Sequence, residues 1–182
     1  MYTLFIDTHL YDINIVLYQD GNIYLHKCID KSMNNNSLLV LSIMECISNI
    51  KLNDIIVVNG PGSFTGVRTG VTVAKTLSYL LNIPIKTVSY LEIIDYSLDG
   101  NENLVGFYDN SGIFVGKFSN HKLIGNYEYI RKSELNLNEL SNLKTDVIID
   151  YSKIYNLISK LPKIDSKLVN PIYVKKISVE YD

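Results

Sequence analysis

The chain has 182 residues, of which 47% are hydrophobic and 20% are charged, and its formal net charge is -2. This length suffices for one large domain or two small lobes, and the charge excludes a global basic field that would hold nucleic acid without help. No apolar run reaches the roughly 18 residues of a membrane span, and Met1–Asp12 lacks the basic segment of a secretory signal, so we expect a cytoplasmic protein.

The first half of the chain predicts three strands followed by alternating helices and strands. Two β-rich runs flank Asp20-Gly21, a dipeptide typical of a tight hairpin. Ser37 is expected to cap the first helix, and Gly60-Pro61-Gly62 breaks the strand before the second helix. The predicted strands are residues 3–7, 13–18, 22–29, 55–59 and 85–89, and the predicted helices are residues 37–49 and 65–81.

The second half repeats this opening in shortened form. Asn120-His121 stands where Asp20-Gly21 stood, Ser133 is expected to cap a weak helix, and the polar residues 97–103 are expected to link two lobes. The predicted strands are residues 104–109, 113–119, 122–131 and 146–150, the predicted helices are residues 133–143 and 151–161, and residues 171–177 close the chain.

Two copies of a β-β-β-α-β-α unit are typical of one α/β architecture, the duplicated actin-like, ribonuclease-H-like fold. We therefore predict an N-terminal lobe at residues 1–98 and a shortened C-terminal lobe at residues 99–182.

The glycine-rich segment at residues 59–70, NGPGSFTGVRTG, matches neither common nucleotide-binding motif. Thr65 stands where a P-loop and a dinucleotide-binding fingerprint each need glycine, and no Gly-Lys pair follows. A tight turn from strand to helix is therefore favoured over a phosphate cradle.

The sequence does not say which residues pack against the apolar faces of the two predicted helices. Gly66, Gly70 and Ala74 line the middle of the apolar arc of the second helix, so another backbone approaches closely there. That backbone belongs either to this chain, which the spacing alone favours, or to a partner. The first helix is apolar over a continuous arc of roughly 160°, with Leu38 and Leu41 inside its polar arc as well. Either the neighbouring helix or a partner is expected to cover it.

The run from Gly60 to Glu92, GPGSFTGVRTGVTVAKTLSYLLNIPIKTVSYLE, closely resembles the signature of the TsaB (YeaZ) family. The opening FIDTHLYDINIVLYQDG and the closing PIYVKKI are similar to the two ends of that family. The resemblance implies the duplicated actin-like fold and a role in the bacterial machinery that places threonylcarbamoyl on tRNA adenosine. It implies a non-catalytic scaffold that binds and activates the catalytic paralogue TsaD, works with the ATPase TsaE and touches tRNA only indirectly.

In this family the two first-lobe helices dock on the paralogue or on another copy of themselves. The start of the first helix reads Asn36-Ser37 where the family often has His-Ser, and Asp109-Asn110-Ser111 replaces the family's Asp-Ala-Arg. The interface residues that the resemblance implies are Ser37, Leu38, Leu41, Met44, Glu45, Phe64, Gly66, Arg68, Gly70 and Ala74.

No catalytic role is expected. The catalytic paralogue holds a metal with a His-x-x-x-His helix, whereas His9, His26 and His121 are not at helical spacing. Cys28 and Cys46 also lack metal-ligand spacing, so we expect reduced thiols and neither metal nor cofactor.

Three polar residues remain as candidates for a cleft between the lobes. Asp7 and Thr8 follow the first strand, and Asp109 ends its counterpart in the second lobe. The glycine that an actin-like ATPase uses for phosphate is missing after Asp7, which is therefore expected either as a vestigial contact or as a cap of the turn. The rival hypotheses are an autonomous small-molecule kinase or peptidase of the same superfamily, and a self-associating homodimer that uses the same helices.

Overall fold

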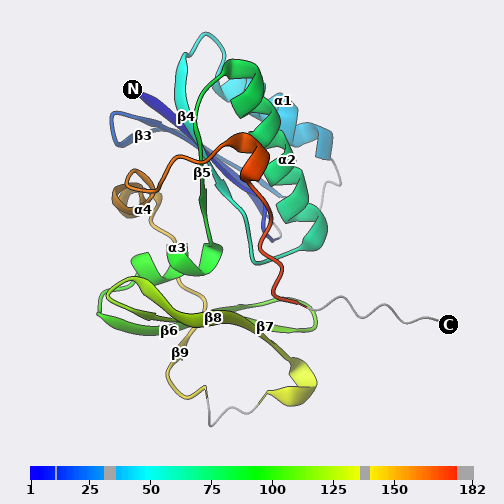
Figure 1. Ribbon diagram of the computed structural model, residues 1–182, viewed down its shortest axis with the longest axis vertical. Helices are drawn as coiled ribbons and strands as arrows, with labels where there is room; N and C mark the ends of the chain where they lie inside the picture. Colours follow the sequence, from blue (N-terminus) through cyan, green and yellow to red (C-terminus); the bar gives the residue numbers. More distant parts are fainter. Residues whose placement is uncertain (11, 31–35, 136–139, 176–182) are drawn as a thin grey trace, which may run out of the picture.

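The chain folds into two mixed β-sheets with helices on both faces of the first sheet (Figure 1). The computed structural model describes the chain except for residues 11, 31–35, 136–139 and 176–182. The strand order is β3-β2-β1-β4-β5 in the first sheet and β8-β7-β6-β9 in the second. In each sheet the hairpin strands are antiparallel, and the strand on the other side of the first one is parallel to it. This repeated order confirms the predicted α/β class.

The first half follows the predicted order of elements. Asp20 and Gly21 both have positive φ values, 50° and 89°, as a two-residue hairpin of type I′ requires. The first helix begins at Asn36, so Ser37 lies inside it and does not cap it as predicted, and the second helix is capped by Ser63. The elements are β1 (Tyr2–Asp7), β2 (Asp12–Gln19), β3 (Asn22–Asp30), α1 (Asn36–Cys46), β4 (Leu52–Val58), α2 (Phe64–Leu81) and β5 (Ile85–Val88).

The second half begins with a helix and a second meander. Asn120 and His121 also have positive φ values, 48° and 60°, so the second hairpin repeats the turn of the first without glycine. The elements are α3 (Tyr90–Tyr96), β6 (Glu102–Tyr108), β7 (Gly112–Ser119), β8 (Lys122–Arg131), β9 (Leu143–Lys144) and α4 (Tyr151–Ile158), with 3-10 turns η2 (Lys132–Glu134) and η3 (Ser166–Leu168).

Three predictions for this half were wrong. The helix α3 was missed, although Ser89 and Glu92 form a capping box whose S-x-x-E pattern is visible in the sequence. The described parts of residues 133–143 contain η2 and the start of β9 instead of a helix. Residues 146–150 form no strand, because β9 already pairs with β6 at residues 143–144 and the chain then leaves the sheet to reach α4.

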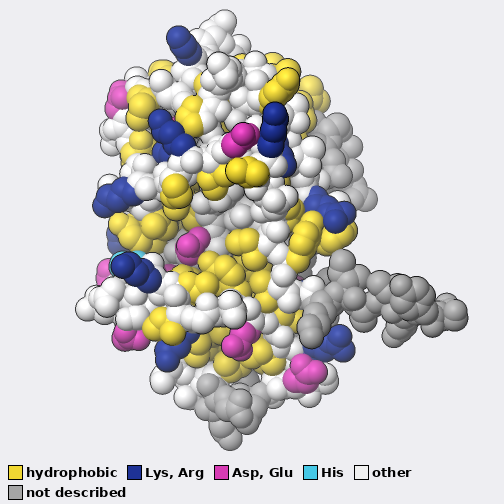
Figure 2. Space-filling model, viewed as in Figure 1, with side chains coloured by type: hydrophobic (Ala, Val, Ile, Leu, Met, Phe, Trp, Pro, Cys, Tyr) yellow, Lys and Arg dark blue, Asp and Glu magenta, His cyan; other side chains and the backbone are white. Residues whose placement is uncertain are grey.

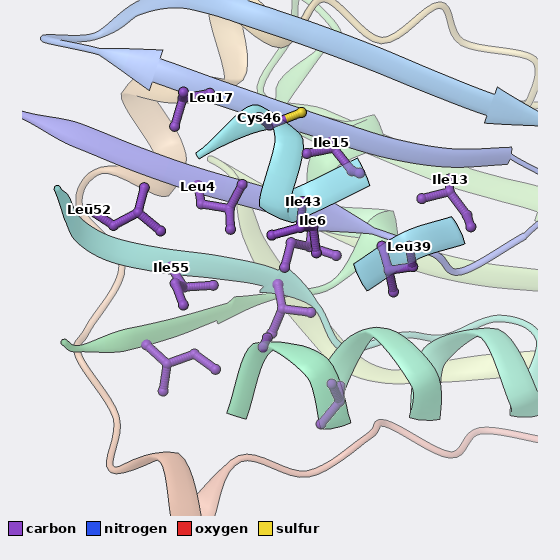
Figure 3. Close-up of a cluster of buried hydrophobic side chains, with 14 of the residues drawn as sticks. Leu4, Ile6, Ile13, Ile15, Leu17, Leu39, Ile43, Cys46, Leu52 and Ile55 are labelled. Atoms are coloured by element: carbon purple, nitrogen blue, oxygen red, sulfur yellow. The ribbon is translucent and has the colours of Figure 1, made fainter. Parts of the chain in front are cut away.

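Side chains alternate along β1 and so fill two separate cores. Leu4 and Ile6 point into a cluster beneath α1 and α2 (Figure 3), whereas Phe5 points into a cluster beneath α4. A third cluster lies between α3 and the second sheet and includes Phe114 and Phe118. The helix α4 thus follows the second meander in the chain but packs on the first sheet, and the division into lobes at residue 98 stays a prediction.

The segment after α4 also returns to the first lobe. We call residues 164–175 the C-terminal strap. Ile164 N donates to Ile85 O over 2.9 Å, and Ile172 N donates to Asn59 O over 2.7 Å. Figure 1 shows this orange-to-red segment passing along α2 and then reaching the second sheet. Among the described helices, none is both long and apolar enough to cross a membrane.

Candidate functional site

The glycine-rich turn before α2 is occupied by the chain's own backbone. A Cβ on Gly60 would lie 2.9 Å from Ile172 O, and a Cβ on Gly62 would collide with His9 O. Ser63 N donates to the same His9 O over 2.7 Å, and the Ser63 side chain accepts from Gly66 N over 3.3 Å. The turn therefore uses its glycines for close approach of the C-terminal strap and of the segment after β1, as the tight-turn interpretation predicted.

The small residues of α2 face inward, toward other residues of this chain. Thr8 Oγ1 donates to Gly66 O over 2.7 Å, and a Cβ on Gly70 would collide with that hydroxyl. Ala74 is fully buried in the cluster beneath α1 and α2. The end of β1 therefore lies against this face of α2, and the assignment of Gly66, Gly70 and Ala74 to a partner interface stays a prediction.

The outer face of α1 is apolar and exposed. Leu39 and Ile43 point into the first core, whereas Leu41 and Met44 are 59% and 55% exposed, and Val40 is also exposed. Leu38 is half-buried, and the Ser37 side chain lies outside the described residues. Neighbouring large apolar side chains on one exposed helix face are typical of an interaction surface. Val40 belongs to this surface but was not among the predicted interface residues.

A charged pair flanks that face. Glu45 accepts from Lys27 Nζ of β3 over 2.7 Å, and both side chains are exposed. A pair of this kind contributes little to stability in water. It gives the apolar face of α1 a polar rim, which is the usual composition of a protein interface.

The N-terminal end of α2 carries an aromatic and cationic cluster. The guanidinium of Arg68 lies 3.8 Å from the centroid of the Phe64 ring, and Arg68 Nε donates to Tyr173 OH over 2.7 Å. The rings of Phe64 and Tyr173 are 5.6 Å apart. Phe64 and Arg68 are among the predicted interface residues, whereas Tyr173 of the C-terminal strap, which contacts both, is not. Its only signal was the Pro-x-Tyr at residues 171–173.

The junction between the lobes is filled by rings. Asp7 Oδ1 accepts from His9 N over 3.0 Å and from His9 Nδ1 over 2.7 Å, so Asp7 caps the turn after β1. The His9 ring stacks on Tyr90 at 3.5 Å and meets the edge of Phe107 at 5.3 Å. His9 Nε2 is buried and has no hydrogen-bond partner among the described residues. These contacts bring the end of β1 against β6 and leave Asp7 buried.

Asp109 closes the corresponding turn of the second lobe. Its carboxylate accepts from Ser111 N, Gly112 N and Tyr129 OH, each over 2.8 Å. The other oxygen accepts from Lys175 Nζ of the C-terminal strap over 3.1 Å. Partial burial raises the pKa of Asp109, but these hydrogen bonds and the Lys175 charge outweigh burial and hold the pKa below its ordinary value. Asp109 thereby ties the strap to the second lobe.

The histidines and cysteines lie apart. His26 Nε2 lies 3.0 Å from Asn14 Oδ1, and His121 Nδ1 lies 2.8 Å from Asp95 Oδ2. Cys28 is exposed and Cys46 is buried, and both are free thiols. Within the described ranges, no three His, Cys, Asp or Glu side chains come together as a metal site.

Comparison of sequences with known proteins gives matches to about half of the chain. The model of the family described as "TsaD: tRNA N6-adenosine threonylcarbamoyltransferase" matches residues 34–107. The chain is 38% identical over 100 residues to the tRNA threonylcarbamoyladenosine biosynthesis protein TsaB of Bacillus subtilis, covering 52% of this chain and 43% of the relative. It is 33% identical over 97 residues to the TsaB of Buchnera aphidicola, covering 50% of this chain and 43% of the relative. The chain thus matches less than half the length of these curated relatives.

Comparison of structures gives matches over both lobes. YeaZ from Pseudomonas aeruginosa superposes with a TM-score of 0.73 and 15% identity, covering 94% of this chain and 99% of that chain. A putative N-acetylmannosamine kinase from Listeria monocytogenes superposes with a TM-score of 0.50 and 15% identity, covering 68% of this chain and 49% of that chain. These likenesses establish the duplicated actin-like architecture. The similarity therefore covers about half of the chain in sequence and 94% of it in fold.

Proposed function

We propose, from the premise that this chain is a relative of the TsaB (YeaZ) family, that it is the accessory subunit of a tRNA threonylcarbamoyladenosine machinery. In this role it binds and activates a catalytic paralogue of the TsaD type, in the cytoplasm and together with the ATPase TsaE. The observation that carries the proposal is the exposed apolar face of α1, formed by Val40, Leu41 and Met44.

The physical support is the cost of leaving this face in water. Each large apolar side chain contributes about 1.5–3 kcal/mol when it is fully buried. Leu39, Ile43 and Cys46 already supply α1 with a buried face, so Leu41 and Met44 are not needed to hold the helix on the sheet. A partner helix laid against α1 would remove them from water, and the Lys27–Glu45 pair would stay at the rim.

The lobe junction supports a role without catalysis. A small-molecule kinase of this fold needs room between the lobes for its substrates, and here His9, Tyr90 and Phe107 pack there against one another. The glycine-rich turn is likewise engaged with the chain's own backbone at Gly60 and Gly62. We therefore favour the accessory role over an autonomous kinase or peptidase.

The distribution of cations supports only an indirect contact with tRNA. Lys75, Lys86 and Lys175 donate to oxygens of this chain. On the face shown in Figure 2, the Lys and Arg side chains are scattered among acidic and apolar ones instead of forming a patch. A phosphate backbone needs several cations together, so in this proposal other members of the machinery hold the tRNA.

Size-exclusion chromatography with light scattering tests the proposal, with the chain alone and mixed with its cognate TsaD-type paralogue. The wild type is expected to form a heterodimer. Leu41→Glu should weaken it by at least about tenfold because a carboxylate would be buried. Ile148→Glu is the matched control, since Ile148 is 90% exposed and lies far along the chain from α1.

The same experiment distinguishes the heterodimer from the homodimer alternative. A wild-type homodimer that Leu41→Glu disrupts, with no heterodimer at micromolar concentration, would support self-association through α1. If Leu41→Glu and Ile148→Glu weakened the heterodimer equally, α1 would not be part of the interface.

A further inference from the structure

We infer that Phe64, Arg68 and Tyr173 form a binding site for a carboxylate of the partner protein, so that the C-terminal strap is part of the docking surface. The inference rests on the proposed function and deepens it. It adds a residue from the far end of the chain and specifies what the partner contributes, namely an Asp or Glu side chain.

Arg68 is held in one place before any partner arrives. Its guanidinium lies 3.8 Å from the Phe64 centroid, and its Nε donates to Tyr173 OH over 2.7 Å. A free arginine on a helix surface loses considerable side-chain entropy when it binds. Here the stacking and the hydrogen bond have already restricted the side chain, so a ligand finds the guanidinium oriented.

Among the described residues, none contacts the terminal nitrogens of this guanidinium through a hydrogen bond or an ion pair, so these nitrogens can serve a ligand. Within the described part of the chain, only Tyr173 OH accepts from Arg68, and no carboxylate lies within ion-pair distance of it. An arginine edge with two donors matches the two oxygens of a carboxylate. The exposed rings of Phe64 and Tyr173 flank the charge, and aromatic side chains around an arginine are the usual composition of the strongest contacts in protein interfaces.

The strap fixes the position of Tyr173. Ile172 N donates to Asn59 O over 2.7 Å on one side of Tyr173, and Lys175 Nζ donates to Asp109 Oδ2 over 3.1 Å on the other. Val174 is half-buried and packs against the core of the second lobe. The Tyr173 hydroxyl is therefore presented to Arg68 by the tertiary structure and not by a free chain end.

The chemistry favours a protein carboxylate over a nucleic-acid phosphate. Arg68 is one of only two arginines in the sequence, and the chain's net charge is -2. Two lysines of these elements are already engaged, Lys175 of the strap with Asp109 and Lys75 of α2 with Val169 O. A single cation between two rings suits one carboxylate, whereas a polyanion is held by several cations together.

Titration calorimetry of the full chain against the cognate paralogue tests the inference. Arg68→Gln and Tyr173→Ala should each weaken binding by about tenfold or more, and Arg68→Lys should lose most of the same affinity because lysine cannot bind bidentately. The combined variant should be no weaker than about the worse single one, because Tyr173 acts through Arg68. Tyr24→Ala is the matched control, since Tyr24 is 56% exposed on β3 and Tyr173 is 52% exposed.

Two further readouts complete the test. Added salt should weaken the wild-type complex more than the Arg68→Gln complex. Circular dichroism and thermal melting confirm that each variant is folded, and Tyr173→Phe, which keeps the ring and loses the hydroxyl, replaces Tyr173→Ala if the latter melts early.

The failures are distinguishable. If no complex forms with the wild type, the proposed function and the inference both fail. If Leu41→Glu abolishes the complex while Arg68→Gln and Tyr173→Ala bind as the wild type does, only the inference is overturned. If Arg68→Gln instead removes affinity for tRNA and leaves the protein complex intact, the ligand is a phosphate and the inference is overturned as well.

Discussion

Thr8 and Gly70 show how closely α2 lies against the end of β1. The Thr8 hydroxyl donates to Gly66 O over 2.7 Å and occupies the space that a side chain at position 70 would need. Gly70 therefore does two things: it lets the helix approach the strand, and it leaves room for a buried hydroxyl that satisfies a helix carbonyl.

Replacing Gly70 by alanine should destabilise the protein, although alanine is ordinarily better than glycine in a helix by about 1 kcal/mol. The added Cβ collides with Thr8 Oγ1, so we expect a net loss of about 1–3 kcal/mol in the free energy of unfolding. In a Thr8→Ala background the same change should be neutral or stabilising. Urea denaturation of the four proteins of this cycle measures both effects, and a stabilising Gly70→Ala in the wild type would contradict the close approach.

The parallel pair β4 and β5 carries a buried ion pair on the face that α4 covers. Lys86 Nζ lies 2.7 Å from Asp54 Oδ2 and donates to Ser159 O over 3.2 Å. Both side chains are buried, and Asp54 Oδ1 has no partner among the described residues. The pair connects two strands and the end of α4, so it helps to determine where α4 lies on the sheet.

Removing one member of this pair should cost far more than removing both. Lys86→Met leaves a buried carboxylate without its cation, and we expect a loss of about 3–5 kcal/mol. The double variant Lys86→Met, Asp54→Val should recover most of that loss, because no charge is then left buried. Unfolding in urea, with Lys153→Met on exposed α4 surface as the control, distinguishes the two cases. Equal losses of unfolding free energy in the single and double variants would show that the pair contributes through packing and not through charge.

At the scale of the whole molecule, the C-terminal strap joins the two lobes. It pairs with β5 through Ile164, hydrogen-bonds Asn59 at the end of β4 and reaches Asp109 through Lys175. The rings of His9, Tyr90 and Phe107 fill the junction beside it. The relative position of the lobes thus depends on contacts between segments that are far apart in the chain.

Because of the Asp109–Lys175 contact, the stability of the folded protein should decrease at low pH. The folded pKa of Asp109 lies below its ordinary value, so its carboxylate stabilises the folded state above the unfolded pKa of about 3.9. That stability is lost as the pH falls through the folded pKa. We expect Asp109→Asn to lower the melting temperature at pH 7, and the difference from the wild type to shrink below about pH 4. Melting curves of both proteins from pH 7 to pH 2.5 check this, and a constant difference would show that the charge of Asp109 is irrelevant.

Much of the architecture could be predicted because turn dipeptides and the spacing of apolar residues indicate the secondary structure of the segments that contain them. Asp20-Gly21 sets its hairpin through positive φ values at both residues, and the apolar runs gave β1, β2 and α2 nearly to the residue. The apolar pattern predicted the wrong elements at residues 133–150, where the structure has the 3-10 turn η2 and the two-residue β9 in place of a helix and a strand. Elements that short leave almost no periodicity to detect.

The candidate site could be predicted only in part. Helix periodicity placed the buried residues Val67, Val71 and Ala74 on the apolar side of α2, but it also placed there Leu80, which is 70% exposed. Periodicity also could not say whose side chains cover a buried helix face. Leu41 and Met44 are exposed and remain candidates for a partner, whereas Gly66 and Gly70 face the chain's own Thr8.

The sequence by itself determined the order of the elements from β1 to β5, the duplicated α/β class and the resemblance to one family, because each follows from short-range spacing or from a contiguous motif. Only the tertiary structure decided that Thr8 fills the groove of α2 and that Tyr173 holds Arg68 from 105 residues away. Spacing along a chain shows which side chains avoid water, whereas the identity of their neighbours depends on how distant segments pack together.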